Sequence, residues 1–282
     1  EKGGIKSVEK FDNGEKKSIK KEIKISNSIN ADGFSIKGVI KNKIKHGLFK
    51  VYDQNNKLFK QEFYNNDTLA FSGIVDTLNN KNGLWIYYYS NGEIKRKGSY
   101  LNNKKTGNWE FYYKNKNLEQ KGSYLYGNPQ GKWIWLYENK QIRREEEYLR
   151  GKINGQVHEY DSLGNIITKG NYINGIKEGP WEYIYNDFQE NGVFADGMKT
   201  GEWKALYSNG TKLFNGEYLN DIPINNHTYY FPNGKVKEIG SYLRGEKEGE
   251  WKKYNETGVV TITTFYKNGE EYKVDGVKIK WK

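Results

Sequence analysis

The sequence has no cysteine, one methionine, four prolines and no long apolar run. Without cysteine, the chain cannot form disulfides, thiolate zinc sites or thiol nucleophiles. Cysteine usage therefore does not indicate whether the protein lies in an oxidising or a reducing compartment. No apolar run approaches the roughly 20 residues that a membrane-spanning helix needs. Four prolines against 32 glycines favour strands and tight turns, because proline interrupts ladder hydrogen bonds whereas glycine permits positive φ.

Aliphatic residues are also scarce, and the mean hydropathy is −0.98. A chain that combines few aliphatics with high charge is often disordered. Here 24 Tyr, 12 Phe and 8 Trp take their place, and each aromatic ring buries a large area. We therefore expect a folded chain with a thin, aromatic core.

The net charge of +11 is concentrated near the N-terminus. Residues 1–60 hold 15 Lys and 7 acidic residues and so contribute +8. This stretch is typical of a solvated, edge-protecting face, with a surface for acidic partners as the alternative. The chain opens with EKGGIK and no methionine, which fits a trimmed mature form or a cloning boundary. We expect export to the periplasm, cell surface or medium, with a cytoplasmic location as the alternative.

A repeat of about 24 residues dominates the sequence. Taking the glycine of Gly-x-Trp as the start, the units begin at Gly47, Gly83, Gly107, Gly131, Gly155, Gly179, Gly201, Asn225 and Gly249. The unit from Gly179 is two residues short, and half a unit is inserted near Gly73. A glycine that begins a Gly-x-Tyr triplet recurs later in most units.

Two positions after the start are the most regular. The second position after it, the tryptophan position, holds Phe49, Trp85, Trp109, Trp133, Val157, Trp181, Trp203, His227 and Trp251. The fifth position is always large and apolar or aromatic, as Tyr52, Tyr88, Tyr112, Leu136, Tyr160, Ile184, Leu206, Tyr230 and Tyr254. Turn dipeptides such as Asn91-Gly92 and Asn209-Gly210 separate the runs.

Each unit therefore predicts two short strands joined by Asn-Gly type turns. The fold class we expect is all-β: an elongated, single-layer antiparallel β-meander of ~24-residue hairpin repeats, stabilised by stacking on neighbours. We expect one continuous domain, with basic N-terminal strands and a cap over residues 1–46, the repeat array over 47–268 and a C-terminal capping strand over 269–282.

Alternation of side chains assigns structural roles within the strands. A strand glycine leaves bare backbone that a neighbouring aromatic ring can cover. We expect this packing role for the tryptophans Trp85, Trp109, Trp133, Trp181, Trp203 and Trp251 and for the glycines Gly98, Gly122, Gly170, Gly216 and Gly240.

The candidates for partner binding are aromatic positions close to the tryptophans. The fourth position varies in chemistry, as Tyr87, Phe111, Trp135, Glu159 and Tyr183. The fifth position, with Tyr88, Tyr112 and Tyr160, leaves two alternatives open. Either a bulge turns it to the tryptophan face, or it forms a second aromatic stripe on the more polar side.

The segments NGEIKRKGSYLNNKKTGNWEFYY, NGTKLFNGEYLND and NGKVKEIGSYLRGEKEGEWKKY carry a family resemblance. They resemble the MORN-repeat variant of bacterial proteins in the YwqK antitoxin-like group, over about Gly38 to Tyr272. The resemblance implies a β-hairpin scaffold for protein–protein interaction and, in some members, neutralisation of a toxin. Val157, His227, the short unit and the insertion near Gly73 depart from the pattern.

No catalytic constellation interrupts the repeat, so we expect neither an enzyme nor a cofactor. His46, His158 and His227 occupy different positions and predict no shared metal, and alternation splits Glu145, Glu146 and Glu147 between faces. Protein binding is favoured, with a toxin or a cell-surface protein as partner. Carbohydrate or cell-wall glycan binding through the aromatic face is the alternative. No nucleic acid is expected, because the basic excess lies away from the best aromatic repeats.

Overall fold

The computed structural model describes the backbone of residues 8–12, 15–19 and 23–279, and the side chains of residues 26–279. All regular structure in these ranges is β-strand. A small separate sheet near the N-terminus consists of β1 (Val8–Asp12) and β2 (Glu15–Ile19), which pair antiparallel. Part of the basic N-terminal stretch predicted as strands and cap lies outside the described residues.

The chain divides into two compact units, at Gln141 and Ile142. The sheet of the first unit contains β3 (Ile23–Ile29), β4 (Ser35–Lys41), β5 (Ile44–Lys45), β6 (Gly47–Tyr52), β7 (Leu58–Asn65), β8 (Thr68–Val75), β9 (Lys81–Tyr88), β10 (Ile94–Leu101), β11 (Lys104–Tyr112), β12 (Leu118–Leu125) and β13 (Asn128–Leu136).

The second unit continues the same pattern of hairpins. It contains β14 (Ile142–Leu149), β15 (Lys152–Tyr160), β16 (Ile166–Ile173), β17 (Ile176–Lys177), β18 (Gly179–Ile184), β19 (Phe188–Ala195), β20 (Met198–Tyr207), β21 (Lys212–Leu219), β22 (Ile222–Tyr230), β23 (Val236–Leu243), β24 (Glu246–Tyr254), β25 (Val260–Lys267), β26 (Glu270–Val274) and β27 (Val277–Lys278).

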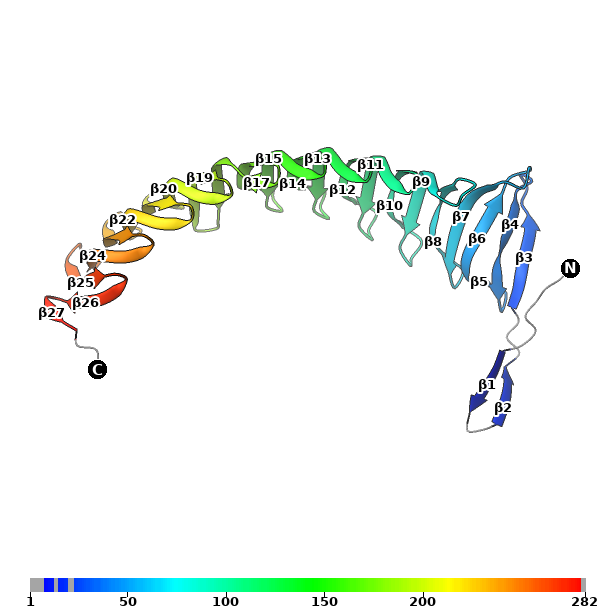
Figure 1. The fold of residues 1–282 in the computed structure, drawn as a ribbon, viewed down its shortest axis with the longest axis horizontal. Helices are drawn as coiled ribbons and strands as arrows, with labels where there is room; N and C mark the ends of the chain where they lie inside the picture. The colour runs from blue at the N-terminus through cyan, green and yellow to red at the C-terminus, as the bar shows by residue number, and fades with distance from the viewer. Residues whose placement is uncertain (1–7, 13–14, 20–22, 280–282) are drawn as a thin grey trace. The chain divides into compact units, whose positions relative to one another are not determined.

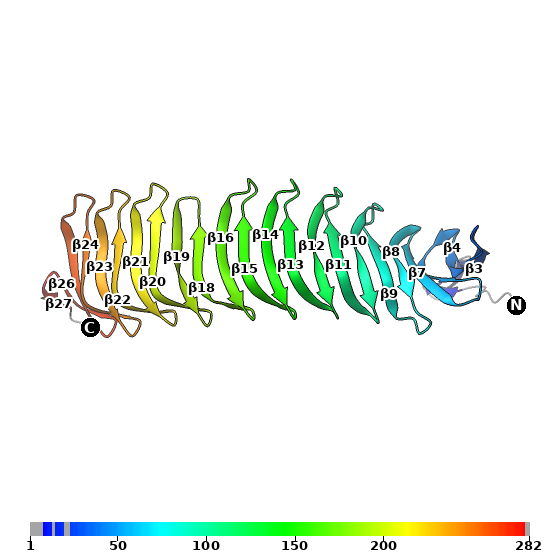
Figure 2. The same cartoon turned by 90° about the horizontal axis from the view of Figure 1, so that it is seen from above.

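Within each unit, strands pair antiparallel in the order of the sequence. Gly98 of β10, for example, lies opposite Trp85 of β9 on one side and Trp109 of β11 on the other. Figure 1 and Figure 2 show the strands of each unit side by side in one layer. The prediction of an all-β antiparallel meander of hairpin repeats is therefore confirmed. The single-domain boundaries 1–46, 47–268 and 269–282 stay predictions; the last range contains β26 and β27.

The glycines that begin the units lie where the hydrogen-bond pairing between adjacent strands is interrupted. Gly107 has φ of 61°, and the register between β10 and β11 shifts after Gly98, so that Ser99 lies opposite Thr106. A left-handed residue at such a bulge favours glycine. Asn225, which replaces glycine at the start position, adopts φ of 58°, a conformation that asparagine tolerates better than most residues.

The half-unit insertion near Gly73 changes the face on which the large rings lie. Phe49 packs on Tyr64 at 5.2 Å between ring centroids. Trp85 instead packs on Phe71 at 5.7 Å, and Phe71 stacks on Phe63 at 5.3 Å. Because Phe63 and Tyr64 are neighbours in β7, their side chains point to opposite faces. The aromatic row therefore switches sides of the sheet between β6 and β9.

Candidate functional site

The tryptophans lie directly on the glycines of the strand that precedes them in the chain. A Cβ added to Gly98 would lie 2.3 Å from Cδ2 of Trp109, which leaves no room for any side chain. Trp109 itself is fully buried. The same contact joins Gly38 with Phe49, Gly73 with Trp85, Gly122 with Trp133, Gly170 with Trp181, Gly192 with Trp203, Gly216 with His227 and Gly240 with Trp251. We call this row of glycine-seated rings the tryptophan ladder.

The indole nitrogens extend the ladder with hydrogen bonds to the backbone. Trp109 donates from Nε1 to the carbonyl of Ser99 at 3.1 Å, at the point where the register shifts. The same bond, to the residue after the covered glycine, is made by Trp85, Trp133, Trp203 and Trp251. These five rings are thus fixed both by their contact with glycine and by one polar bond, whereas the buried Nε1 of Trp181 has no hydrogen-bond partner among the described residues.

His227 takes the place of a tryptophan. Its Nε2 lies 2.9 Å from the carbonyl oxygen of Glu217, its side chain is 1% exposed, and its ring covers Gly216. Burial lowers the pKa of His227, and Nδ1 has no hydrogen-bond partner among the described residues. The neutral ring with its proton on Nε2 therefore reproduces the donor of the indole.

Val157 and Glu146 form a ladder position, between repeats that keep the pattern, where both members of the pair differ. Glu146 stands where other repeats have the covered glycine, and Val157 opposite it replaces the tryptophan. The Glu146 carboxylate is 3% exposed, pairs with Arg144 at 2.6 Å and accepts a 2.6 Å hydrogen bond from Tyr148. Arg144 also pairs with Glu159. A smaller aliphatic side chain thus leaves space for a buried ion pair.

Lysine side chains lie over the ladder, which our reading of the sequence missed. Lys105 Nζ lies 4.6 Å from the ring centroid of Trp109, and Lys199 Nζ lies 3.9 Å from that of Trp203. Equivalent contacts involve Lys45, Lys81, Lys177 and Lys247. These lysines all stand four residues before the ring, so the periodic alignment contains the signal.

The fourth-position side chains lie on the same face as the ladder. Phe111 contacts Trp109 and Trp133 at 6.1 and 6.4 Å between ring centroids. Tyr87, Trp135 and Tyr183 each lie within about 6 Å of the ladder ring of their own strand. All of them remain half-buried rather than covered. Their role in partner binding stays a prediction.

The fifth-position tyrosines lie on the opposite face, so the second of the two alternatives applies. Tyr112 donates a 2.5 Å hydrogen bond to Glu110, which pairs with Lys97 at 2.9 Å. A register shift does occur beside Tyr112, but the extra residue, Glu119, belongs to the partner strand and leaves Tyr112 in place. Tyr160 likewise stacks beside His158 at 6.4 Å. Tyr88 follows Tyr87 directly and shares this face by alternation.

The groups that could support catalysis are dispersed. In the described part of the chain, no three His, Asp or Glu side chains gather as metal ligands. Glu145 lies opposite His158 and within 3.5 Å of the Tyr160 hydroxyl, whereas Glu146 belongs to the ladder face. Glu145 and His158 are thus cross-strand neighbours on the face opposite the ladder, and Glu146 is separated from them by the sheet.

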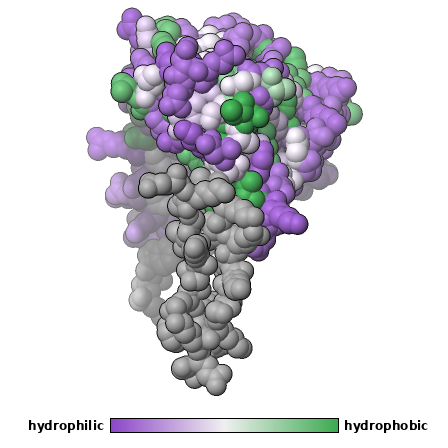
Figure 3. All heavy atoms as spheres, turned by 90° about the vertical axis from the view of Figure 1, so that its right-hand side faces the viewer, coloured by the Kyte–Doolittle hydropathy of each residue, from purple (hydrophilic) through white to green (hydrophobic). Residues whose placement is uncertain are grey.

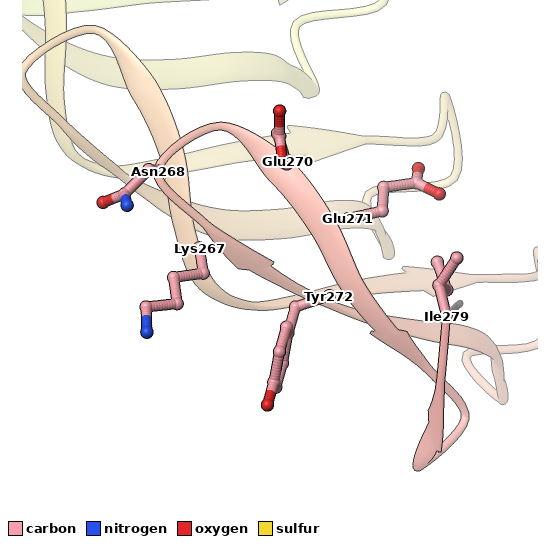
Figure 4. A pocket seen from close by; sticks show the side chains of 6 residues that line it. All are labelled: Lys267, Asn268, Glu270, Glu271, Tyr272 and Ile279. Carbon is pink, nitrogen blue, oxygen red and sulfur yellow. The ribbon is translucent and has the colours of Figure 1, made fainter. Parts of the chain in front are cut away.

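A shallow pocket of about 430 Å³ lies near the C-terminus, around β26. Figure 4 shows Lys267 and Tyr272 pointing away from Glu270. Glu271 accepts a 3.0 Å hydrogen bond from Tyr266 outside the pocket lining. The charged groups therefore do not converge on a common point.

An apolar row runs along the turns that follow the second strands. Its members are about half exposed and recur with the repeat: Leu101, Leu125, Leu149, Ile173, Leu219 and Leu243. Seen from the end that carries β3 and β4, the visible described surface is mainly hydrophilic with small separate hydrophobic patches (Figure 3). The described residues contain no helical segment that could span a membrane.

Comparison with known families identifies the repeat. The sequence profile described as MORN repeat variant matches residues 45–66, 81–102, 105–126, 129–149, 226–243 and 247–268. Four of the six matched segments begin at a ladder lysine, namely those that start at residues 45, 81, 105 and 247, and all six end at the end of a second strand or in the turn that follows it. The narrower likeness to the YwqK antitoxin-like group stays a prediction. No curated protein matches the chain.

Proposed function

We propose, from the premise that this chain belongs to the MORN repeat variant family, that it is a non-catalytic scaffold that binds another protein. Repeats of this family generally serve as interaction scaffolds, and the all-β hairpin array is of that type. The ladder face of each unit is the side of its sheet that carries the tryptophan ladder, from β9 to β13 in the first unit and from β14 to β25 in the second, and it is the surface we assign to the partner.

One observation carries this proposal: the fixed and the variable positions of the repeat share one face. Glycine, tryptophan and lysine are used in packing, whereas the fourth position displays Tyr87, Phe111, Trp135, Glu159 and Tyr183 beside them. A constant framework with changing, half-buried side chains is the arrangement that a specific protein interface requires.

Glycan binding is the alternative function for an aromatic face. Stacking on a sugar needs an open ring face, but the guanidinium of Arg96 lies 4.3 Å over the ring of Tyr87. Lysines cover the ladder rings in the same way. These cations favour a protein partner over a glycan.

Toxin neutralisation is a narrower proposal, supported by the resemblance to the YwqK antitoxin-like group, and export is proposed together with it. Co-expression of the chain with its captured partner tests the first, because a toxin would arrest growth without the chain and permit it in its presence. Cell fractionation with an antibody against the chain tests the second.

The binding face can be tested with two adjacent tyrosines that point to opposite sides of β9. The wild-type chain is used to capture partners from source cells, and each captured protein is then purified and measured directly by biolayer interferometry. We expect Tyr87→Ala to weaken binding and Tyr88→Ala to leave it nearly unchanged. The pair Phe111→Ala and Tyr112→Ala repeats the comparison in β11.

Two results would count against the proposal. A glycan array that gives saturable binding, with no purified protein bound, would favour the carbohydrate reading. Equal weakening by Tyr87→Ala and Tyr88→Ala, in variants of equal thermal stability, would remove the assignment to the ladder face.

A further inference from the structure

Two repeats of the second unit place a carboxylate beside the ladder lysine. Glu190 pairs with Lys199 at 2.8 Å, and Glu238 pairs with Lys247 at 3.2 Å. In both repeats the glutamate stands two residues before the covered glycine and nine residues before the lysine. The ladder face therefore has a defined place that accommodates a carboxylate next to a lysine amine.

In the first unit, Arg96 occupies this same place in the repeat of Gly98. The lysine nine residues later is Lys105, so two cations stand where the repeats of Glu190 and Glu238 have an ion pair. Lys105 Nζ lies 4.5 Å from the ring centroid of Tyr124 and 3.3 Å from its hydroxyl. Burial, together with the charge of Arg96, lowers the pKa of Lys105.

Arg96 has no counterion within the described part of the chain. Its guanidinium lies over Tyr87, and its Nε is buried without a hydrogen-bond partner there. A buried donor left without a partner is costly. The site therefore holds a donor that a ligand could satisfy.

A third cation completes the cluster. Lys81 Nζ lies 4.2 Å from the ring centroid of Trp85, 5.0 Å from that of Tyr100, and 3.0 Å from the Tyr87 hydroxyl. Burial raises the pKa of Tyr100 to about 12, although the charges of Lys81 and Arg96 both oppose this rise. Like Arg96, neither Lys81 nor Lys105 forms an ion pair with a described carboxylate.

We propose that Lys81, Arg96 and Lys105 form a docking site for an acidic segment of the partner protein, one of whose carboxylates takes the place that Glu190 and Glu238 fill in their own repeats. This assignment rests on the proposed protein-binding function. A guanidinium matches a carboxylate through two parallel hydrogen bonds. The rings of Tyr87, Tyr100 and Phe111 provide an apolar floor for the rest of the segment.

The probe for this site is a fluorescein-labelled decamer of glutamate, measured by fluorescence anisotropy with the full chain. The key variant is Arg96→Glu, which places a carboxylate beside Lys105 and thus rebuilds the Glu190–Lys199 arrangement. We expect it to weaken peptide binding by about tenfold or more while thermal unfolding shows an intact fold. Arg96→Gln removes only the charge, so its affinity for the peptide should lie between those of the wild type and Arg96→Glu.

The matched control is Arg143→Glu, which makes the same charge change at an exposed position of the other unit. It should leave the affinity for the peptide nearly unchanged. Equal weakening by Arg143→Glu would show a response to net charge alone and overturn the site. Equal binding of the peptide by wild type and Arg96→Glu would do so as well.

Two further measurements distinguish an acidic peptide from other anionic ligands, and a failure of this site from a failure of the proposed function. Arg96-dependent binding of phosphatidylserine vesicles or of an oligothymidylate, with no binding of the glutamate peptide, would overturn the acidic-segment assignment. A captured protein that still binds the Arg96→Glu variant but not Tyr87→Ala would overturn this site and leave the proposed function standing. Failure to bind any protein would remove the proposed function itself.

Discussion

His227 replaces an indole, because its Nε2 lies 2.9 Å from the carbonyl oxygen of Glu217 and donates to it as the indole Nε1 does in other repeats. Its ring lies between Tyr218 and Tyr242, with centroid distances of 5.2 and 4.7 Å. Trp109 lies between Tyr100 and Tyr124 in a comparable way, at 5.1 and 6.0 Å. The aromatic surroundings are thus shared, but only the imidazole can take up a proton.

The lowered pKa of His227 predicts a loss of stability in mild acid. The ordinary value is 6.5, and burial lowers it in the folded state. Below about pH 6.5 the unfolded chain therefore binds a proton that the folded chain does not, so the free energy of unfolding falls as the pH falls. His227→Trp should remove this contribution. Urea unfolding of both proteins between pH 7.5 and 5.5 should show a stability difference that grows toward acid pH; a constant difference would contradict a buried neutral ring.

Substitution of a covered glycine should displace its ring. Gly98→Ala places a methyl group within 2.3 Å of Trp109, and overpacking of this kind costs about 1–3 kcal/mol. Chemical denaturation measures the loss. Ser99→Ala is the control, because its carbonyl bond to Trp109 is kept. An equal loss of stability in Gly98→Ala and Ser99→Ala would show that Trp109 is not closely packed on Gly98.

The Glu146–Val157 position predicts that glycine and tryptophan act as a pair. Trp109→Val alone should cost about 3–4 kcal/mol, by analogy with other large-to-small aromatic truncations. In the double variant Gly98→Ala, Trp109→Val, the methyl group enters the space left by the indole. The double variant should therefore be less destabilised than the sum of the single variants. Additive losses would refute direct coupling.

The buried Glu146 carboxylate should depend on Arg144. Arg144→Met leaves the carboxylate, 3% exposed, without its ion pair, and removal of one partner from a buried pair costs about 3 kcal/mol or more. Thermal and urea unfolding test this. Arg143→Met, at the exposed neighbouring position, should change stability by no more than about 0.5 kcal/mol.

The ladder lysines should differ in their contribution to stability. Lys199→Met deprives Glu190 of its partner and removes a cation–π contact, for an expected loss of about 1–2 kcal/mol. Lys105→Met also loses a cation–π contact but relieves repulsion with Arg96, so its effect should stay within about 0.5 kcal/mol of zero. A larger loss at Lys105 than at Lys199 would contradict the absence of a counterion for Lys105.

Periodicity made much of the fold predictable. Asn91-Gly92 and similar dipeptides mark turns, and alternation around Gly98 and Tyr100 predicts a half-buried second strand, because both signals are local. The lysine four residues before most of the rings was equally visible, although Trp133 and His227 have a proline there, and aligning the repeats by charge as well as by ring would have found it.

Features that depend on partners across the sheet could not be predicted in this way. Which strand carries the extra residue beside Tyr112 depends on pairing with β12, and the change of face between Phe49 and Trp85 depends on the register of β7 and β8. His227 appeared as a departure from the repeat because its hydrogen bond to Glu217 is made in three dimensions. Arg96 was unremarkable until the ion pairs of Glu190 and Glu238 were known.

Each ring packs on a glycine that lies earlier in the chain, so the glycine is always synthesised before the ring that covers it. Gly98 leaves the ribosome before Trp109, so every ring meets a seat that has already been synthesised, and growth from the N-terminus proceeds without waiting for later strands. At the end of the row, Thr264 stands where the next glycine would be and lies opposite Val274 rather than a tryptophan. Among the described strands, the last glycine covered in this way is therefore Gly240, beneath Trp251, and the same order of synthesis holds for every covered glycine before it.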